Sequence, residues 1–110
     1  MTFAGDVPEG TFVRFMRANF EKLTDAASVA AVDTKPFEKK HQFALLISCV
    51  GRKLVLGTKT VEEVKAVDMI FNHQTLLSGF YSYGEISPLV ESNSCQLHNQ
   101  TMTITAFSEV

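Results

Sequence analysis

The chain has 110 residues, of which 45% are hydrophobic and 20% charged, and this size and composition predict one soluble globular domain with a single core, spanning residues 1–110. Ten basic and 12 acidic residues give a formal net charge of −2, and without a basic stripe we expect no nucleic-acid partner. The longest apolar run, Phe43–Ile47, is far shorter than the roughly 20 residues that span a bilayer, and the N-terminus does not resemble a signal peptide, so we expect no membrane partner and a cytoplasmic location.

The N-terminal region is predicted to form strand, turn, strand. Residues 5–10, GDVPEG, are turn formers, and residues 11–17, TFVRFMR, are rich in strand formers. From Asn19 the spacing becomes helical, with Asn19 as N-cap and Pro36 at or just beyond the helix end. The apolar face of this helix is expected to comprise Phe20, Leu23, Ala27, Ala30 and Ala31.

The middle of the chain is predicted to hold the central strand and a second helix. Residues 43–50, FALLISCV, form a short apolar run bounded by polar residues, typical of a strand that is buried on both faces. Thr60 and Glu63 have the spacing of a capping box, in which each side chain bonds the other residue's backbone amide. The helix that follows should end near Asn72, with its stripe at Val61, Val64, Val67 and Phe71 and with Ile70 beside it.

The C-terminal third is predicted to be an antiparallel hairpin. Residues 76–86 are expected to be a strand, 87–94 a loop, and 95–107 one long strand or two short ones. Met102, Ile104 and Ala106 alternate with threonines, which predicts one core face. The element order ββαβαββ predicts an α+β domain, with a mainly antiparallel sheet and two helices.

The stretch GFYSYGEI, residues 79–86, is a candidate binding strand. In an extended chain Tyr81, Tyr83 and Glu85 would share one face. In one hairpin register, Glu85, Tyr83 and Tyr81 lie across from Leu97, Asn99 and Thr101, and a slip of one residue brings His98 and Gln100 there instead. Two interpretations remain open: a polar pocket for a small or zwitterionic ligand, and an ordinary solvated sheet face.

Arg52 and the two cysteines are further candidates. Arg52 follows the central strand and has the geometry to grip a carboxylate, although a structural role is the other interpretation. Cys49 and Cys95 have no zinc or redox spacing, and we expect both to be free thiols that are buried or partly buried. Without a nucleophile motif or a phosphate loop, we expect no enzymatic activity, no cofactor and no metal site.

Four segments together resemble a known family: FAGDVPEGTFVRFM at 3–16, ISCVGRKLVLG at 47–57, LSGFYSYGEISP at 77–88 and CQLHNQTMTI at 95–104. They are similar to the C-terminal FIST domain of the F-box and intracellular signal transduction family. The resemblance implies a cytoplasmic sensory module that binds small ligands such as amino acids. It also implies an N-terminal FIST half upstream, which is missing from this sequence, and a signalling output domain as partners.

The resulting hypothesis is a non-catalytic, ligand-binding sensory module. Its alternative is a docking or dimerisation module of a signalling or F-box-type protein, with a second copy of the chain as one partner. A third reading, a thiol enzyme that uses Cys49 or Cys95 with His98, is not supported by any role that the family assigns. The expected ligand-binding residues are Arg52, Tyr81, Tyr83, Glu85, His98 and Asn99. The expected motif or structural residues are Cys49, Gly51, Gly79, Phe80, Gly84, Cys95 and Thr101.

Overall fold

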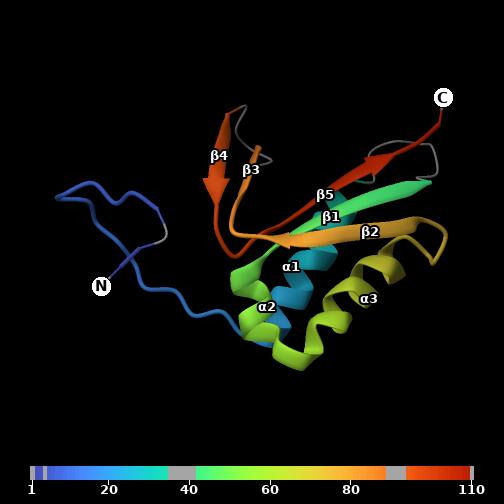
Figure 1. The fold of residues 1–110 in the computed structure, drawn as a ribbon, viewed down its shortest axis with the longest axis horizontal. Helices are drawn as coiled ribbons and strands as arrows, with labels where there is room; N and C mark the ends of the chain where they lie inside the picture. The colour runs from blue at the N-terminus through green and yellow to red at the C-terminus, as the bar shows by residue number, and fades with distance from the viewer. Residues whose placement is uncertain (1, 4, 35–41, 89–93, 110) are drawn as a thin grey trace.

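The structure is a computed structural model that describes residues 2–3, 5–34, 42–88 and 94–109. Pro36 and residues 89–93 of the predicted loop lie outside this described part. Figure 1 shows the elements in chain order. They are α1 (Phe20–Asp33), β1 (Phe43–Cys49), α2 (Val50–Leu56), the 3-10 turn η1 (Gly57–Lys59), α3 (Thr60–Ile70), β2 (Leu76–Ser82), β3 (Glu85–Pro88), β4 (Cys95–His98) and β5 (Met102–Phe107).

The strands form two sheets, one of three strands in the order β2-β1-β5 and one of two strands, β3-β4. β1 is parallel to β2 and antiparallel to β5. The α+β class is therefore confirmed, but the expectation of a mainly antiparallel sheet is wrong for the β1–β2 pair. Parallel neighbours need a long crossover connection, and α2, η1 and α3 provide it.

Helices α1 and α3 cover one face of the larger sheet (Figure 1). α1 begins as predicted, because the Asn19 side chain accepts a hydrogen bond from the Lys22 amide at 2.9 Å. Small alanines on its buried face let α1 lie close to its neighbours. The buried core consists of Ala27, Ala31, Ala44, Leu46, Val67 and Phe71, with Ile70, Leu77, Met102 and Ile104 packed against it.

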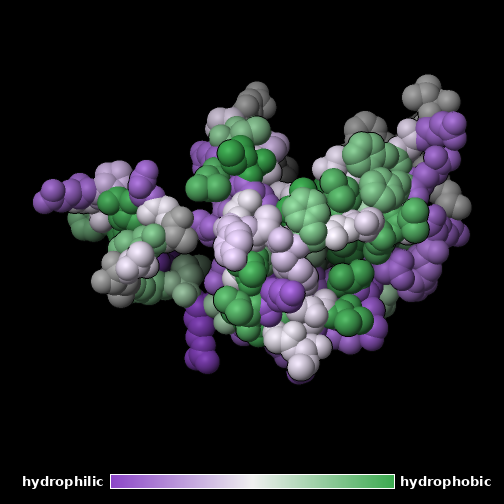
Figure 2. Space-filling view, viewed as in Figure 1, coloured by the Kyte–Doolittle hydropathy of each residue, from purple (hydrophilic) through white to green (hydrophobic). Residues whose placement is uncertain are grey.

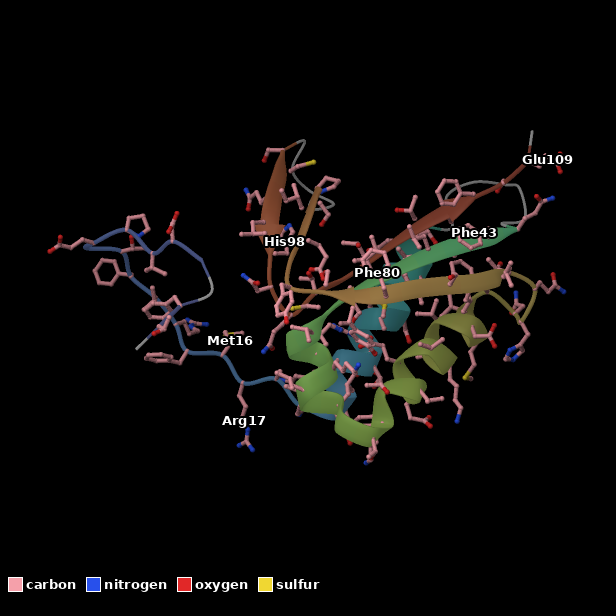
Figure 3. All side chains as sticks on the ribbon, in the orientation of Figure 1. Met16, Arg17, Phe43, Phe80, His98 and Glu109 are labelled. Atoms are coloured by element: carbon pink, nitrogen blue, oxygen red, sulfur yellow. The ribbon has the colours of Figure 1, made fainter. Side chains whose placement is uncertain are left out.

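β1 is the central strand, as predicted, but its two faces differ in burial. Ala44 and Leu46 on the helix side are buried, whereas alternate residues on the other side are only half-buried. No helix covers that second face in the described part of the chain, and Figure 3 shows Phe43 and Phe80 lying there. The expectation of burial on both faces is therefore wrong for this side.

The predicted N-terminal strands are not present in the described residues. The predicted turn is confirmed, because the Thr11 amide donates to the Pro8 carbonyl at 3.2 Å and Gly10 has a φ of 82°. Residues 11–19, however, have no assigned helix or strand and belong to neither sheet. We call residues 5–19 the arm. It extends away from the helices and the larger sheet, with Met16 and Arg17 labelled on it in Figure 3.

The C-terminal region contains two short strands, one of the predicted alternatives, but residues 76–86 are not one strand. β2 stops at Ser82, the chain bends at Tyr83 and Gly84, and β3 joins the second sheet. The β3–β4 pairing is antiparallel with Glu85 opposite His98. Of the two predicted registers, this is the one shifted by one residue, since the other places Leu97 opposite Glu85. Among the described residues, no helix is long and apolar enough to cross a membrane.

Candidate functional site

A buried ion pair between Arg52 and Glu63 lies under the end of β1. Arg52 is 1% exposed and Glu63 is 0% exposed. The Arg52 Nε donates to Glu63 Oε2 at 2.8 Å, and Ser48 Oγ donates to Glu63 Oε1 at 2.8 Å. Both carboxylate oxygens therefore have partners, and these interactions offset the desolvation penalty of burying the charge.

The same guanidinium ties distant segments together. Arg52 Nη2 donates to the carbonyl of Leu23 in α1 at 2.6 Å, and Nη1 reaches the carbonyl of Gln100, just before β5, at 3.5 Å. Arg52 and Glu63 therefore connect α1, α2, α3 and the turn between β4 and β5. Every buried side-chain nitrogen and oxygen in the described residues has a hydrogen-bond partner.

The starts of α2 and α3 differ from the predicted ones, and both differences allow this network to form. Val50 begins the short helix α2 instead of ending the strand, and this places Arg52 in its first turn, pointing inward. The predicted capping box is wrong: Lys59 is the N-cap of α3 and makes no side-chain cap bond, and Thr60 has helical φ and ψ of −57° and −29°. A capping side chain needs an extended backbone, so the Glu63 side chain is available to the interior.

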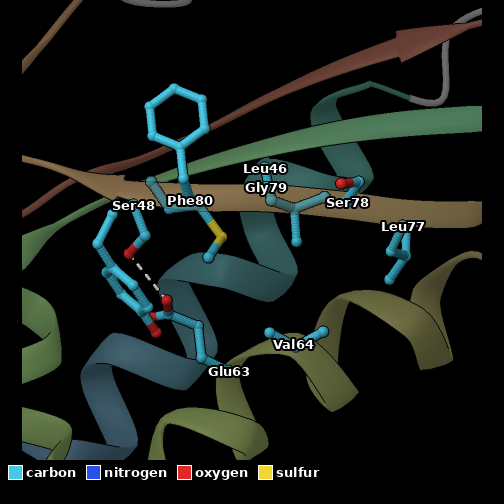
Figure 4. Close-up of a pocket in the computed structure, with 10 residues that line it drawn as sticks. Leu46, Ser48, Glu63, Val64, Leu77, Ser78, Gly79 and Phe80 are labelled. Carbon is cyan, nitrogen blue, oxygen red and sulfur yellow. Dashed lines mark hydrogen bonds between the residues drawn. The ribbon is translucent and has the colours of Figure 1, made fainter.

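A cavity of about 240 Å³ opens beside this ion pair, between α3 and the β1–β2 part of the sheet (Figure 4). One end is polar, because Ser48, Glu63 and Tyr81 converge there. The remaining walls are mainly apolar. The lining residues are Leu46, Ser48, Glu63, Val64, Leu77, Ser78, Gly79, Phe80, Tyr81 and Met102.

Tyr81 supplies a neutral hydroxyl at the polar end. Its partial burial raises the pKa of the phenol above the usual value, and the negative charge of Glu63 raises it further, while Arg52 and a hydrogen bond with Thr60 oppose the rise. The hydroxyl therefore stays protonated at neutral pH and is able to donate. The Lys53 ammonium lies 5.1 Å from the centre of the Tyr81 ring, which places an exposed cation at the same end.

The predicted binding residues separate into two groups. Tyr81 lines the cavity, and Arg52 lies behind it with its guanidinium engaged by protein groups. Tyr83 is 91% exposed at the bend, so it does not share a face with Tyr81. Asn99 is exposed in the turn after β4. The predicted common face of Tyr81, Tyr83 and Glu85 is wrong, because the chain does not remain extended past Ser82.

Glu85 and His98 belong to the second group, at the base of the β3–β4 hairpin. The buried Glu85 carboxylate accepts hydrogen bonds from Ser82 Oγ at 3.1 Å and from Thr101 Oγ1. His98 Nε2 donates to the carbonyl of Ser87 across the hairpin at 3.1 Å. These contacts hold the hairpin against the start of β5.

The motif residues differ in burial, and the two glycines Gly79 and Gly84 serve close packing. Cys49 is a buried free thiol whose sulfur accepts from the Gly51 amide at 3.4 Å, and Cys95 is an exposed free thiol, so the burial expected of Cys95 is wrong. At Gly79 an added Cβ would lie 1.9 Å from the Leu46 carbonyl oxygen, so only glycine fits. Gly84 packs beside Leu97, and Phe80 is 57% exposed.

Sequence reasoning missed Glu63 as a member of the site, and it missed Lys53, which does not line the cavity but lies over the Tyr81 ring. The predicted stripe of α3 is wrong at Val61 and Val64, which are exposed. A signal for Glu63 existed, because it lies four residues before Val67 and eight before Phe71, which are buried. A charged residue at such a position requires a buried partner. The described residues contain no group of three His, Cys, Asp or Glu side chains placed to hold a metal ion.

Comparison with known proteins gives one family match. The family model described as FIST C domain matches residues 1–88, which is 88 of the 110 residues. No curated protein and no solved structure matches the chain.

Proposed function

Because this chain belongs to the FIST C domain family, which is associated with sensory modules of signal transduction, we propose that it is a non-catalytic module that binds a small metabolite of the amino-acid type. The observation that carries the proposal is the cavity beside Tyr81 and Glu63. Apolar walls with a few converging polar groups are typical of ligand sites. A volume of about 240 Å³ suits a ligand smaller than a drug molecule.

The polar groups favour a particular ligand chemistry. The Glu63 carboxylate is fully buried and bonded to Arg52 and Ser48, so its negative charge would favour a ligand ammonium from behind the cavity wall without a direct contact. The Tyr81 hydroxyl supplies a donor, and Lys53 supplies a positive charge for a ligand carboxylate. The ligand's apolar part would contact Leu46 and Val64.

The non-catalytic part of the proposal is supported by the surroundings of Cys49. Its thiol is buried and already accepts a backbone hydrogen bond, and an apolar setting makes a thiol less reactive. Sensing would require the ligand to bind one of two arrangements of the module more tightly than the other, so that binding shifts their populations. An upstream FIST half and a cytoplasmic output domain are the partners that we propose for this signal.

The test is a thermal-shift screen of the domain against amino acids and related metabolites at millimolar concentration. A ligand at 100 times its Kd stabilises the folded state by about 2.7 kcal/mol, a change that melting curves resolve. Tyr81→Phe should weaken the binding of a hit roughly 10-fold, because one hydrogen bond is lost while the ring remains. Tyr83→Phe is the matched control, because Tyr83 is 91% exposed. The proposal fails if no metabolite raises the melting temperature, or if both variants weaken binding equally.

A further inference from the structure

The arm exposes an unusual set of large apolar side chains. Every residue from 5 to 17 is exposed; Phe12 is 103% exposed, Phe15 74% and Met16 85%. Monomeric proteins rarely present such contiguous apolar groups to water unless the surface binds something. The radius of gyration is 15.0 Å, against about 13 Å for a compact chain of this length. The space-filling view in Figure 2 shows the arm projecting away from the rest of the molecule.

The sequence of the arm suits a strand that lacks a partner. Phe12, Val13 and Phe15 are strand formers. If residues 11–16 form a strand, Phe12 and Met16 lie on one side and Val13 and Phe15 on the other. The backbone of this segment pairs with neither sheet. A strand with apolar groups on both faces and an unpaired backbone is complementary to a sheet edge that is itself incomplete.

The β3–β4 hairpin is such an incomplete sheet. It has two strands, and a two-stranded ribbon is marginally stable in water without a third strand or a covering element. Ile86 and Leu97 are opposite each other in the register and are 75% and 59% exposed. Figure 1 shows the hairpin standing apart from the helix layer, at the same end of the molecule as the arm.

Of the two free edges of this hairpin, β4 is the better acceptor. β3 ends at Pro88, which lacks an N–H and interrupts an edge ladder. β4, CQLH, contains no proline, and β3 is its only ladder partner in the described chain. An added strand on β4 would extend the outward face that carries Leu97.

We propose that two copies of the chain exchange arms, with residues 11–16 of each copy adding as a third strand to β4 of the other. This interaction goes beyond ligand binding in the cavity and does not depend on it. The exchange is symmetric, so one two-fold axis satisfies both arms and both hairpins. The four exchanged phenylalanines alone bury roughly 600–1,000 Å². With the hairpin surfaces that they cover, the total reaches the roughly 1,200–2,000 Å² of a stable interface.

A second copy fits better than the chain's own hairpin. In the single chain the arm is exposed from residue 5 to residue 17, and the hairpin's Ile86 and Leu97 are exposed as well. Both complementary surfaces are therefore open at once in one copy. Pairing between two copies covers them without altering the position of α1, which begins at Phe20.

The first test measures the oligomeric state of the whole chain by light scattering over a range of concentrations. We expect a dimer whose dissociation constant rises roughly 100-fold or more in the Phe12→Asp/Phe15→Asp variant, because buried aromatic anchors dominate interfaces. Leu54→Gln is the matched control: Leu54 is 80% exposed but lies on α2, and the variant should dimerise as the parent does. A chain that is monomeric at all concentrations, or a double variant that dimerises normally, would overturn the proposal.

The second test uses the exposed thiol of Cys95 on β4. Cysteines are placed one at a time at residues 12 to 16 in a Cys95→Ser background, and each variant is mixed with a mass-tagged parent chain under mild oxidation. We expect a disulfide between the two chains at alternate arm positions and none for a control cysteine at residue 54. With Cys95 retained, a disulfide that closes within one monomeric chain would show that the arm pairs with its own hairpin and would refute the exchange.

Discussion

Removing the charge of Glu63 while keeping its shape is the sharpest perturbation of this fold. In Glu63→Gln the Arg52 guanidinium stays buried at 1% exposure without its compensating charge. Breaking a buried ion pair on one side costs about 3–5 kcal/mol. A domain of this size has a total free energy of unfolding of about 5–15 kcal/mol, so the variant should lose a large part of its stability.

Urea unfolding followed by circular dichroism measures this loss. At a slope of about 2 kcal/mol per M, the expected loss moves the midpoint down by about 1.5–2.5 M. Glu62→Gln is the matched control, since Glu62 is the neighbouring residue and forms an exposed pair with Lys65 at 3.0 Å. Such pairs contribute about 0–1 kcal/mol.

A double replacement separates a buried charge from simple packing. Arg52→Met together with Glu63→Leu removes both charges and fills similar space, so it should recover most of the stability that Glu63→Gln loses. An exposed pair contributes at most about 1 kcal/mol. If the free energies of unfolding of Glu63→Gln and Glu62→Gln differ by less than this amount, then Glu63 does not stabilise the buried Arg52, and the reasoning is refuted.

Two other predictions concern β2. Gly79→Ala should destabilise the fold by about 1–3 kcal/mol through overpacking, because the added Cβ would lie 1.9 Å from a carbonyl oxygen of β1. Gly5→Ala is the control and should be neutral in the same urea assay, because an added Cβ there has no atom within 4 Å. Equal unfolding midpoints for the two variants would contradict the close approach of β1 to Gly79. The raised pKa of Tyr81 means that the folded state holds the phenol proton more tightly than the unfolded state, so its contribution is complete below about pH 10 and is lost as pH rises through the folded pKa. The free energy of unfolding of the parent, relative to that of Tyr81→Phe, should therefore fall above about pH 10. If the difference between the two free energies does not change with pH, the raised pKa of Tyr81 is refuted.

Local patterns in the sequence were sufficient for elements that neighbouring residues control. Asn19 and the alanine face of α1 depend on contacts within a few residues, and both were predicted correctly. The apolar run from Phe43 marks the central strand because no other segment is as continuously apolar. Alternation in β5 identified Met102 and Ile104, which are partly buried and pack against the core. In each case the signal lies within one element, in its cap, its apolar run or its alternation.

The site depended on contacts between distant segments. Glu63 has the spacing of a capping residue, and only the position of Arg52, eleven residues earlier on a separate helix, makes it a buried ion-pair partner. The parallel pairing of β1 and β2 follows from where the crossover helices pack, which no local pattern specifies.

The strand-forming residues of the arm show the same contrast between local propensity and contacts with distant segments. Their propensity predicts a strand, but residues 11–17 form none and belong to neither sheet. Whether an extended segment becomes part of a sheet depends on a partner edge, and that edge is set by tertiary or quaternary packing. Sequence by itself determined the helix start, the core strand and the alternating faces, because these rest on backbone geometry and neighbouring side chains. Tertiary structure decided the ion pair, the sheet order and the cavity, because these require groups that meet only after the chain has folded.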